Sequence, residues 1–312
     1  MPSQALAQSA GDASTVKPIR LVNSLSAGSA GDRLARLFAD TLMPLLNQKV
    51  IVDNRPGDGG NIAAQTVARA PADGTMLLFS STASLAIQMT YGAGKLNYDL
   101  RRDFEPISTV AQIPNGLFVT TAIAADTLPA LIKEAKAQPG KLTCASSGVG
   151  GLLHLTCELF KKSAGVDVLH VAYKGSTAFL PELLSGRITL AFDNVPVYVP
   201  LVNAGKLKIL AVTSRKRAAV LPFVPTTAEL GMAQLESTGL FGLLAPLRTP
   251  DELVKRLSRE SVMALKQPSL LAQTRTDGVE PAGSTPQGLR AQIDSEINKW
   301  ARVIRDAKIG RE

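Results

Sequence analysis

The chain has 312 residues, a length that usually forms one large domain or two ordinary ones. Apolar residues make up 45% of it and aromatic residues 4%, a balance typical of helices packed on parallel strands and not of an all-β sandwich. The formal net charge is +8, but the Lys and Arg residues are scattered and no nucleic-acid-binding motif accompanies them. We therefore expect no nucleic-acid partner and a mild attraction for anionic ligands.

Residues 1–16 are small and polar. Ala5, Leu6 and Ala7 are similar to the cleavage end of a secretory signal peptide, without its charged and apolar parts. We interpret the segment as a signal-peptide remnant or, alternatively, as a disordered tail. No apolar run in the sequence reaches the ~20 residues that a membrane-spanning helix requires.

The stretch 19–36 predicts a strand, a turn and a helix. The apolar run at 19–22 is typical of a buried strand, and small residues follow at 24–31. Apolar residues then recur at intervals of three and four, which predicts a helix with one apolar face: Leu34, Leu37, Phe38, Leu42 and Leu45. Asp32 stands where an acidic residue favours a helix start. Because backbone N–H groups at such a turn lack partners, we predict an anion site; a plain strand-to-helix connection is the alternative.

Two further strands are expected at 50–53 and 75–79, with a helix capped by Asn61 between them. The resulting order β-α-β-α-β predicts a parallel sheet with right-handed crossovers. Small polar residues follow each strand, including Ser81 and Thr82 after the third. Ligands of open parallel sheets bind at these carboxyl ends, so the turns are candidate site residues.

The second half of the chain predicts another β/α series. Short apolar runs indicate strands at 117–119, 142–145, 168–172, 188–192 and 208–212. Helices are expected at 127–137, after 151, around 181–184, at 250–265 and from 286 to about 307. The turn at 146–151 is the richest in small residues.

This order of elements predicts an α/β protein of two lobes, each a sheet flanked by helices. Lobe 1 would comprise 17–115 plus 240–312, and lobe 2 would comprise 116–239. Two crossover strands, near 113–120 and 237–245, would join the lobes. The ligand cleft would lie between them.

An enzyme is the competing hypothesis. Residues 27–31 nearly fit the nucleophile elbow G-x-S-x-G, with Ser29 as nucleophile of a serine hydrolase. The first position of the motif is Ala27, however, and no histidine lies near the C-terminus to complete a Ser…Asp…His order. The histidines, His154 and His170, have apolar neighbours.

The sequence contains two cysteines, Cys144 and Cys157. In an exported protein they could pair, and two buried thiols are the alternative. A zinc site with His154 and His170 is disfavoured, because the spacings match no zinc pattern.

A series of short motifs occurs in fixed order from about Lys17 to the C-terminus. They are DNRPG at 53–57, GGNI at 59–62, DG at 73–74, DF at 103–104, PI at 106–107, SSG at 146–148, HL at 154–155, ELF at 158–160, YKG at 173–175, FDN at 192–194, GKL at 205–207 and VPT at 224–226. With these motifs the chain resembles the Bug family of extracytoplasmic solute receptors, the binding proteins of tripartite tricarboxylate transporters.

The resemblance implies a two-lobed periplasmic binding protein fold of type II. It also implies an exported, periplasmic, monomeric receptor that is not an enzyme and needs no cofactor or metal. Such a receptor captures a small carboxylate (a di- or tricarboxylate, an acidic amino acid or an aromatic acid). It presents this solute to integral membrane subunits of a transporter or to a sensor. The effector-sensing half of a regulator is a further class, but the residues before Lys17 are too few for a DNA-binding helix pair.

In the family, the first turn and the glycine-rich turn of the second lobe grip the carboxylates, partly through ordered water. Carried over by position, the ligand-binding residues are Leu25, Ser26, Ala27, Ser29, Ala30, Asp32, Ser81, Thr82, Ser147, Val149, Gly150, Gly151, Tyr173 and Asp193. Asp32 would orient a water, bind an ammonium group or only cap the helix. The first turn departs from the family's Pro-Phe-x-x-Gly-Gly start, with Ser24, Leu25 and Ser29 in place of Pro, Phe and the second Gly. We expect a changed pocket volume and a more polar ligand.

Overall fold

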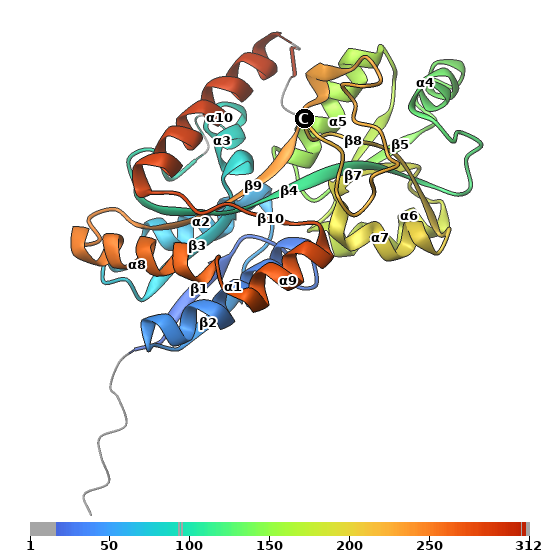
Figure 1. Ribbon diagram of the computed structural model, residues 1–312. Helices are drawn as coiled ribbons and strands as arrows, with labels where there is room; N and C mark the ends of the chain where they lie inside the picture. The colour runs from blue at the N-terminus through green and yellow to red at the C-terminus, as the bar shows by residue number, and fades with distance from the viewer. Residues whose placement is uncertain (1–16, 93, 95, 307, 310–312) are drawn as a thin grey trace, which may run out of the picture.

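The computed structural model describes residues 17–92, 94, 96–306 and 308–309 (Figure 1). The segment 1–16, predicted as a signal-peptide remnant or tail, lies outside them. The strands are β1 Ile19–Asn23, β2 Val50–Asn54, β3 Met76–Ser81, β4 Phe104–Thr120, β5 Thr143–Ser146, β6 Leu169–Ala172, β7 Leu190–Asn194, β8 Leu207–Val212, β9 Thr238–Pro246 and β10 Glu280–Pro281. The helices are α1 Ala30–Leu46, α2 Asn61–Ala68, α3 Thr82–Tyr91, α4 Leu128–Ala137, α5 Leu152–Ala164, α6 Ser176–Ser185, α7 Val195–Asn203, α8 Asp251–Ala264, α9 Pro268–Asp277 and α10 Pro286–Asp306.

Within the described part of the chain, the strands form one mixed sheet with the order β2-β1-β3-β9-β4-β7-β5-β6, and β8 and β10 also pair with β4. Strand β1 lies parallel to β2 and β3, and β5 lies parallel to β6 and β7. The predicted parallel β/α series is therefore present in both halves of the sheet. None of the helices among these residues combines the length and apolar character required to cross a bilayer.

Helices cover both faces of the first half of the sheet. Leu21 of β1 packs with α1, α8 and α9, whereas the adjacent Val22 packs with α2, α3 and α10. Because successive residues of a strand point to opposite faces, a continuously apolar strand is buried on both sides. Figure 1 shows α3 and α10 on one side of the sheet and α1, α8 and α9 on the other.

The second half of the sheet has the same layered arrangement. Leu117 and Val119 of β4 pack with α4 and α5, and Phe118 between them packs with α6 and α7 on the opposite face. Cys144 of β5 and Cys157 of α5 are buried in the first of these cores and are joined as a disulfide. Of the two alternatives stated for the cysteines, the structure therefore shows the disulfide and not two free thiols.

Strand β4 belongs to both halves of the sheet. Its residues 104–114 pair with β9, and its residues 115–120 pair with β7 and β8. The crossing point is polar, because Asn194 Nδ2 donates to Asn115 Oδ1 and Asn115 Nδ2 donates to the Ser237 carbonyl at 3.4 Å. The two halves are thus joined where β4 and the start of β9 pass between them.

Three helices were not predicted: α3, α7 and α9. Helix α7 has the sequence VPVYVPLVN, whose β-branched residues favour strands, but Val195 and Tyr198 are completely buried against β4 and α6 and override that propensity. Helix α3 begins at Thr82, within the serine-rich segment that we interpreted as a turn. The prediction that Asn61 caps α2 was wrong, because Gly60 is the N-cap and Asn61 pairs with Asp58 and Tyr98.

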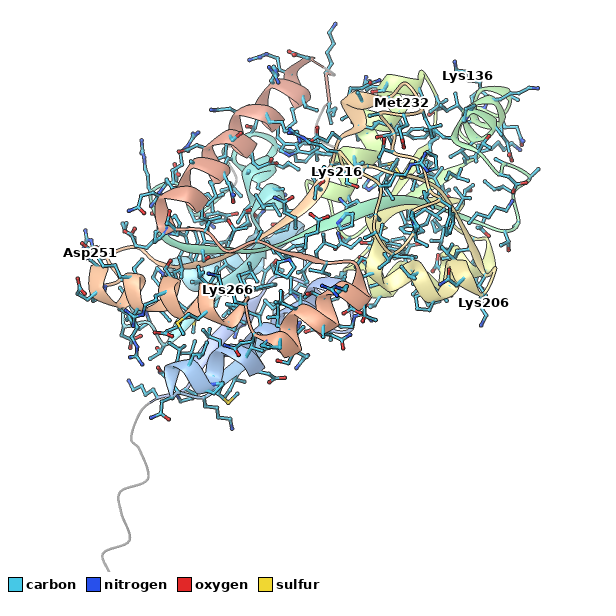
Figure 2. The ribbon with its side chains drawn as sticks, viewed as in Figure 1. Lys136, Lys206, Lys216, Met232, Asp251 and Lys266 are labelled. Carbon is cyan, nitrogen blue, oxygen red and sulfur yellow. A yellow bond between two sulfur atoms is a disulfide. The ribbon has the colours of Figure 1, made fainter. Side chains whose placement is uncertain are left out.

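The positive charge is dispersed over the surface. Figure 2 shows Lys136, Lys206 and Lys266 on separate parts of the molecule. Lys136 belongs to α4, Lys206 follows α7 and Lys266 follows α8. This distribution agrees with the absence of a nucleic-acid-binding motif in the sequence.

The apolar face of α1 provides a test of the core. Phe38 is 0% exposed against Phe79 and the α8 helix, so Phe38→Ala should lower the free energy of unfolding by ~3–5 kcal/mol in urea denaturation. Phe223 is 67% exposed, and Phe223→Ala should change the free energy by less than ~0.5 kcal/mol. Equal effects of the two substitutions would contradict the assigned packing of α1.

Candidate functional site

A narrow cavity lies at the carboxyl ends of the parallel strands. Its volume is about 40 Å³. The turns after β1, β2 and β3 form one wall, and those after β5 and β6 form the other. The lining residues are Ser24, Leu25, Ser26, Ser29, Pro56, Gly57, Gly59, Gly60, Ser81, Ser84, Ser147, Gly151, Gly175 and Ser176. This is the position at which open parallel sheets bind their ligands.

Two glycines show how closely the walls approach each other. Gly59 lies against the turn before α5, so that a Cβ added there would stand 3.3 Å from the carbonyl carbon of Gly150. Gly175 lies against the first turn, and its added Cβ would stand 2.6 Å from Ser26 Oγ. Their φ angles are +60° and +102°, which side chains disfavour. Larger residues at these positions would hold the walls apart.

Hydrogen bonds also join the two walls. Gln88 Nε2 of α3 donates to the Val149 carbonyl at 3.3 Å, and the Leu152 N–H at the start of α5 donates to Ser84 Oγ at 3.1 Å. Both bonds connect α3 with the turn that precedes α5. The structure therefore shows the cleft in a closed arrangement.

Asp32 organises the turn between β1 and α1. Its Oδ2 accepts hydrogen bonds from the Gly28 N–H at 2.9 Å and from Arg36 Nε at 3.2 Å. Its Oδ1 accepts from Asn54 Nδ2 at 2.7 Å. Ser29 is the N-cap of α1, and its Oγ accepts from the Asp32 N–H at 3.2 Å. These contacts favour the helix-capping alternative for Asp32, whose side chain is buried.

Several backbone donors beside the cavity lack protein acceptors. Among the described residues, the N–H groups of Ser26, Ala27 and Ala30 have no hydrogen-bond partner. On the opposite wall, the same holds for the N–H groups of Ser147 and Val149 within the described part of the chain. Unpaired N–H groups at turns and helix starts are a favourable environment for an anion.

Two neighbouring histidines, whose rings are tilted by 31°, support the second wall. His154 Nδ1 accepts from the Gly150 N–H at 2.9 Å, and His170 Nε2 is 2.7 Å from Ser146 Oγ. The two ring centroids are 4.1 Å apart. The Gly148 N–H also donates to Ser146 Oγ, at 3.4 Å. The imidazoles thus position the turn at 146–151 from beneath, and neither lines the cavity.

Tyr173 is turned away from the cavity. Its hydroxyl donates to Glu182 Oε2 at 2.7 Å, and its ring packs against Phe179. Burial, together with the hydrogen bond to Glu182, raises the pKa of Tyr173 to about 12. At neutral pH the Tyr173 hydroxyl therefore keeps its proton and donates it to Glu182.

Asp193 lies behind the cavity wall. Its carboxylate accepts from the Ser176 hydroxyl, from the Asn194 N–H at 2.7 Å and from Tyr198 Oη at 2.8 Å. Burial raises the pKa of Asp193, and these three hydrogen bonds offset only part of that effect. Asp193 therefore positions Ser176, which does line the cavity.

The predicted site residues divide into two groups. Those that line the cavity are Leu25, Ser26, Ser29, Ser81, Ser147 and Gly151. Those that lie beside or behind its wall are Ala27, Ala30, Asp32, Thr82, Val149, Gly150, Tyr173 and Asp193. Thr82, for example, is completely buried and its hydroxyl donates to the Leu240 carbonyl of β9.

The remaining lining residues were not among the predicted site residues: Ser24, Pro56, Gly57, Gly59, Gly60, Ser84, Gly175 and Ser176. The glycine- and proline-rich turn after β2 was visible in the sequence but was not assigned to the site. The rule that ligands bind at the carboxyl ends of strands applied to this turn as well, because β2 runs parallel to β1, but no single residue of the turn was named. Gly175 is the last residue of the YKG motif, and nothing else in the sequence indicated that it belongs to the site.

The geometry does not support a serine hydrolase or a zinc site. Ser29 has ordinary extended dihedrals (φ −70°, ψ 165°), whereas a nucleophile elbow is strained. Its Oγ caps α1, and neither histidine lies among the residues of the cavity wall. Over the residues that the structure describes, no cluster of three or more His, Cys, Asp or Glu is arranged to hold a metal.

A larger cavity of about 440 Å³ lies where α10 approaches β4 and β9. Its charged lining residues are Arg215, Lys216, Glu236, Glu280, Glu296 and Lys299. Arg215 Nε and Lys299 Nζ lie 2.9 and 3.9 Å from Glu236 Oε1, so two of its three cationic side chains already face a carboxylate. The serine- and glycine-lined cavity is therefore the better candidate for an anion.

Known structures with this architecture define the class of the protein. BugD, a periplasmic binding protein, matches with a TM-score of 0.90 at 28% identity, over 95% of this chain and 99% of BugD. An R. palustris protein with adipate matches with a TM-score of 0.89 at 35% identity, over 95% and 99%. MatC from Rhodopseudomonas palustris with bound malate matches with a TM-score of 0.87 at 26% identity, over 93% and 99%. The fold is that of the periplasmic solute-binding proteins, as predicted.

Sequence comparison identifies the family. The model of the family described as "Tripartite tricarboxylate transporter family receptor" matches residues 34–309. Protein BugT of Bordetella pertussis is 33% identical over 296 residues, which cover 95% of this chain and 90% of BugT. The chain belongs to the tripartite tricarboxylate transporter receptor family, and the resemblance to Bug receptors is confirmed.

The hydrogen bonds of Asp32 predict a pH-dependent contribution to stability. Burial raises the pKa of Asp32, but hydrogen bonds from Gly28, Asn54 and Arg36 outweigh it and hold the pKa below the ordinary value of 3.8. A carboxyl group with a lowered pKa in the folded state stabilises the protein above its unfolded pKa, and this stabilisation disappears as the pH falls through the folded pKa. Asp32→Asn should therefore destabilise the protein by ~1–3 kcal/mol at pH 7 and by progressively less below pH ~4.

Urea denaturation of wild type and variant between pH 7 and pH 2.5 measures this difference. Asp40→Asn, on the exposed face of the same helix, is the matched control and should change stability little at any pH. A stability difference between wild type and Asp32→Asn that stays constant over this pH range would contradict the assigned role of the carboxylate.

Proposed function

We propose that this family receptor binds a small carboxylate in the cavity between the turns after β1 to β3 and those after β5 and β6. The observation that carries the proposal is the set of unpaired backbone N–H groups on both walls, at Ser26, Ala27 and Ala30 and at Ser147 and Val149 of the described chain. The relatives with bound adipate and malate support a carboxylate as the solute. The net charge of +8 adds a mild general attraction for anions.

Hydrogen bonds from these N–H groups are sufficient to bind a carboxylate with micromolar affinity, without a cationic side chain. A hydrogen bond to a carboxylate contributes ~1.5–3 kcal/mol, because the acceptor carries a full charge. Three or four of them together reach the ~8 kcal/mol of a micromolar dissociation constant, even after part is offset by the entropy of ordering. The cavity wall contains no Lys, Arg or His.

The predicted site residues take two roles in this proposal. Direct contact, or contact through ordered water, falls to Leu25, Ser26, Ser29, Ser81, Ser147 and Gly151, together with the amides of Ala27, Ala30 and Val149. Positioning of the turns falls to Asp32, Thr82, Gly150, Tyr173 and Asp193. The hydrogen bonds of Asp32 and Asp193 to Gly28 and Ser176 support this division.

Solute entry requires the cleft to open. A cavity of about 40 Å³ is smaller than a dicarboxylate needs. We assign the moving units as lobe 1, residues 17–115 plus 240–312, and lobe 2, residues 116–239. The crossing segments of β4 and β9 would be the hinge, because they are the strands that connect the two halves of the sheet.

The cellular setting of this proposal follows from the family. Its receptors work with transporter membrane components, and we propose that this chain is exported, acts as a periplasmic monomer without catalytic activity and serves either such a transporter or a sensor. The compatible solutes are di- and tricarboxylates, acidic amino acids and aromatic acids.

A panel of carboxylic acids tests the proposal. Protein unfolded in denaturant, freed of small molecules and refolded should show a thermal unfolding midpoint that rises with the logarithm of the concentration of a bound acid. At 100 times the dissociation constant the stabilisation is ~2.7 kcal/mol. The neutral diamide of the same acid is the control and should have no effect. A midpoint that no carboxylate raises at millimolar concentration would exclude this function.

Ser29→Ala separates a receptor from a hydrolase. The variant loses one side-chain oxygen and the helix cap, which costs ~0.5–2 kcal/mol of stability, but a receptor should keep its affinity to within about tenfold. Isothermal titration calorimetry with the bound acid measures the affinity, and p-nitrophenyl acetate measures esterase turnover. Turnover by the wild type that Ser29→Ala abolishes would support the enzyme instead.

A further inference from the structure

Two polar residues of α3, one helical turn apart, bind the start of α5 across the cleft. Ser84 and Gln88 make the hydrogen bonds to the Leu152 N–H and the Val149 carbonyl. The N-cap of α5 is Gly151, which makes no side-chain hydrogen bond to the helix. The Ser84 hydroxyl of lobe 1 therefore supplies the acceptor that the first turn of this lobe 2 helix needs.

The Gln88 side chain fills the space between two glycines, one from each lobe. Gln88 is 3% exposed. A Cβ added at Gly59, in the turn after β2, or at Gly150, in the turn before α5, would stand 2.4 or 2.3 Å from Gln88 Nε2. Any side chain larger than hydrogen at either position would displace the amide. Gln88 is thus packed into the junction of the lobes as well as hydrogen-bonded there.

A buried apolar cluster adjoins these hydrogen bonds and contains residues of both lobes. Leu152 and Leu155 of α5 come from lobe 2. The other buried members come from α3, β9, α10 and the segment after α10, all assigned to lobe 1: Ala83, Ile87, Tyr91, Leu240, Trp300 and Ile309. Each of these residues is at most 8% exposed. Figure 1 shows α3 beside α10, with α5 next to them.

Helix α10 contacts both lobes along its length. Its first part packs into the core of lobe 1 through residues that include Leu289 and Ile293. Further along, Trp300 belongs to the apolar cluster, and Val303 packs against both that cluster and the core of lobe 2. The last turns of α10 therefore reach across the boundary between the lobes.

These contacts favour closure without a solute between the walls. Separation of α5 from α3 and α10 would expose apolar side chains to water, which is unfavourable in proportion to the exposed area. The hydrogen bonds of Ser84 and Gln88 would be exchanged for bonds to water at a smaller cost. Protein groups alone bring the walls together, and only about 40 Å³ remains between them.

We propose that α3 and α10 form a latch with α5 that holds the lobes closed in the absence of solute. The latch consists of Ser84, Gln88 and the apolar cluster, with Trp300 at its α10 end. Solute then enters through a minor open state, whose population limits the rate of entry. The inference goes beyond the proposed function, because it concerns the protein without solute.

Small-angle X-ray scattering tests the latch directly. Wild-type protein freed of small molecules by unfolding and refolding should give a scattering curve that the closed structure fits. Trp300 is the single tryptophan of the chain and is 1% exposed, so its emission should be blue-shifted and weakly quenched by acrylamide in the same sample. A scattering curve that requires separated lobes would overturn the inference.

Two variants should open the protein. Leu155→Ala removes apolar contacts of α5, and Gln88→Ala removes the polar contact, so each should shift the scattering curve toward separated lobes. Leu155→Ala should also raise the acrylamide quenching constant of Trp300 about twofold or more, because the open state exposes the cluster. Two variants that both keep the closed scattering curve would contradict the latch.

Leu131→Ala is the matched control for Leu155→Ala. Leu131 is likewise 0% exposed and belongs to lobe 2, but it lies on α4 in the core of that lobe. The control should lower the urea midpoint of unfolding and leave the scattering curve and the Trp300 quenching unchanged. Opening by Leu131→Ala to the same extent would show a general loss of stability in place of a latch.

These outcomes are separate from those for the proposed function, because no solute is present in the measurements. If the refolded protein is open and carboxylates still stabilise it, the proposed function stands and the latch fails. If it is closed and no carboxylate stabilises it, the latch stands and the proposed function fails. Thermal unfolding of each variant checks that it is folded.

Discussion

The pairing of β4 with its neighbours on both halves of the sheet is the constraint on which the site depends. Residues 104–114 bind β9, and residues 115–120 bind β7 and β8. Each half contributes parallel strands whose carboxyl ends carry short turns rich in Ser and Gly. Because one long strand joins the halves, these two sets of turns meet at a single cavity. Neither half by itself encloses that cavity.

The acidic residues near the cavity organise the turns. Asp32 and Asp193 both lie close to a site proposed for anions, yet neither presents a free carboxylate to it. Asp32 is paired with Arg36 and holds the Gly28 amide, while the buried Asp193 holds Ser176 and has a raised pKa. The ion pair with Arg36 reduces the repulsion that an anionic solute would feel from Asp32, and burial raises the pKa of Asp193 and so disfavours its charged form. Recognition is then left to neutral donors, whose direction the backbone determines.

Much of the fold could be predicted because its signals are local. Apolar runs of four or five residues marked β1, β2 and β3, and the spacing of Leu34, Phe38 and Leu42 marked α1. The helices α3 and α7 could not be predicted, since the serine-rich start of α3 and the β-branched residues of α7 contradict helix propensity, whereas α9, which begins with Pro268 and ends before Gly278, was overlooked. At the site, the serines of the first turn were found from their place after β1, but the turn after β2 and Gly175 were not.

The sequence by itself determined where strands end and small-residue turns begin, and its motifs determined the family. Periodicity and side-chain size act over a few residues, so they can be read along the chain. Only the tertiary structure decided which turns face each other, that Tyr173 and Asp193 point away from the cavity, and that the Ser26 hydroxyl is buried without a hydrogen-bond partner in the described chain. Those outcomes depend on contacts such as Gly175 against Ser26, which join residues about 150 positions apart through the shared strand β4.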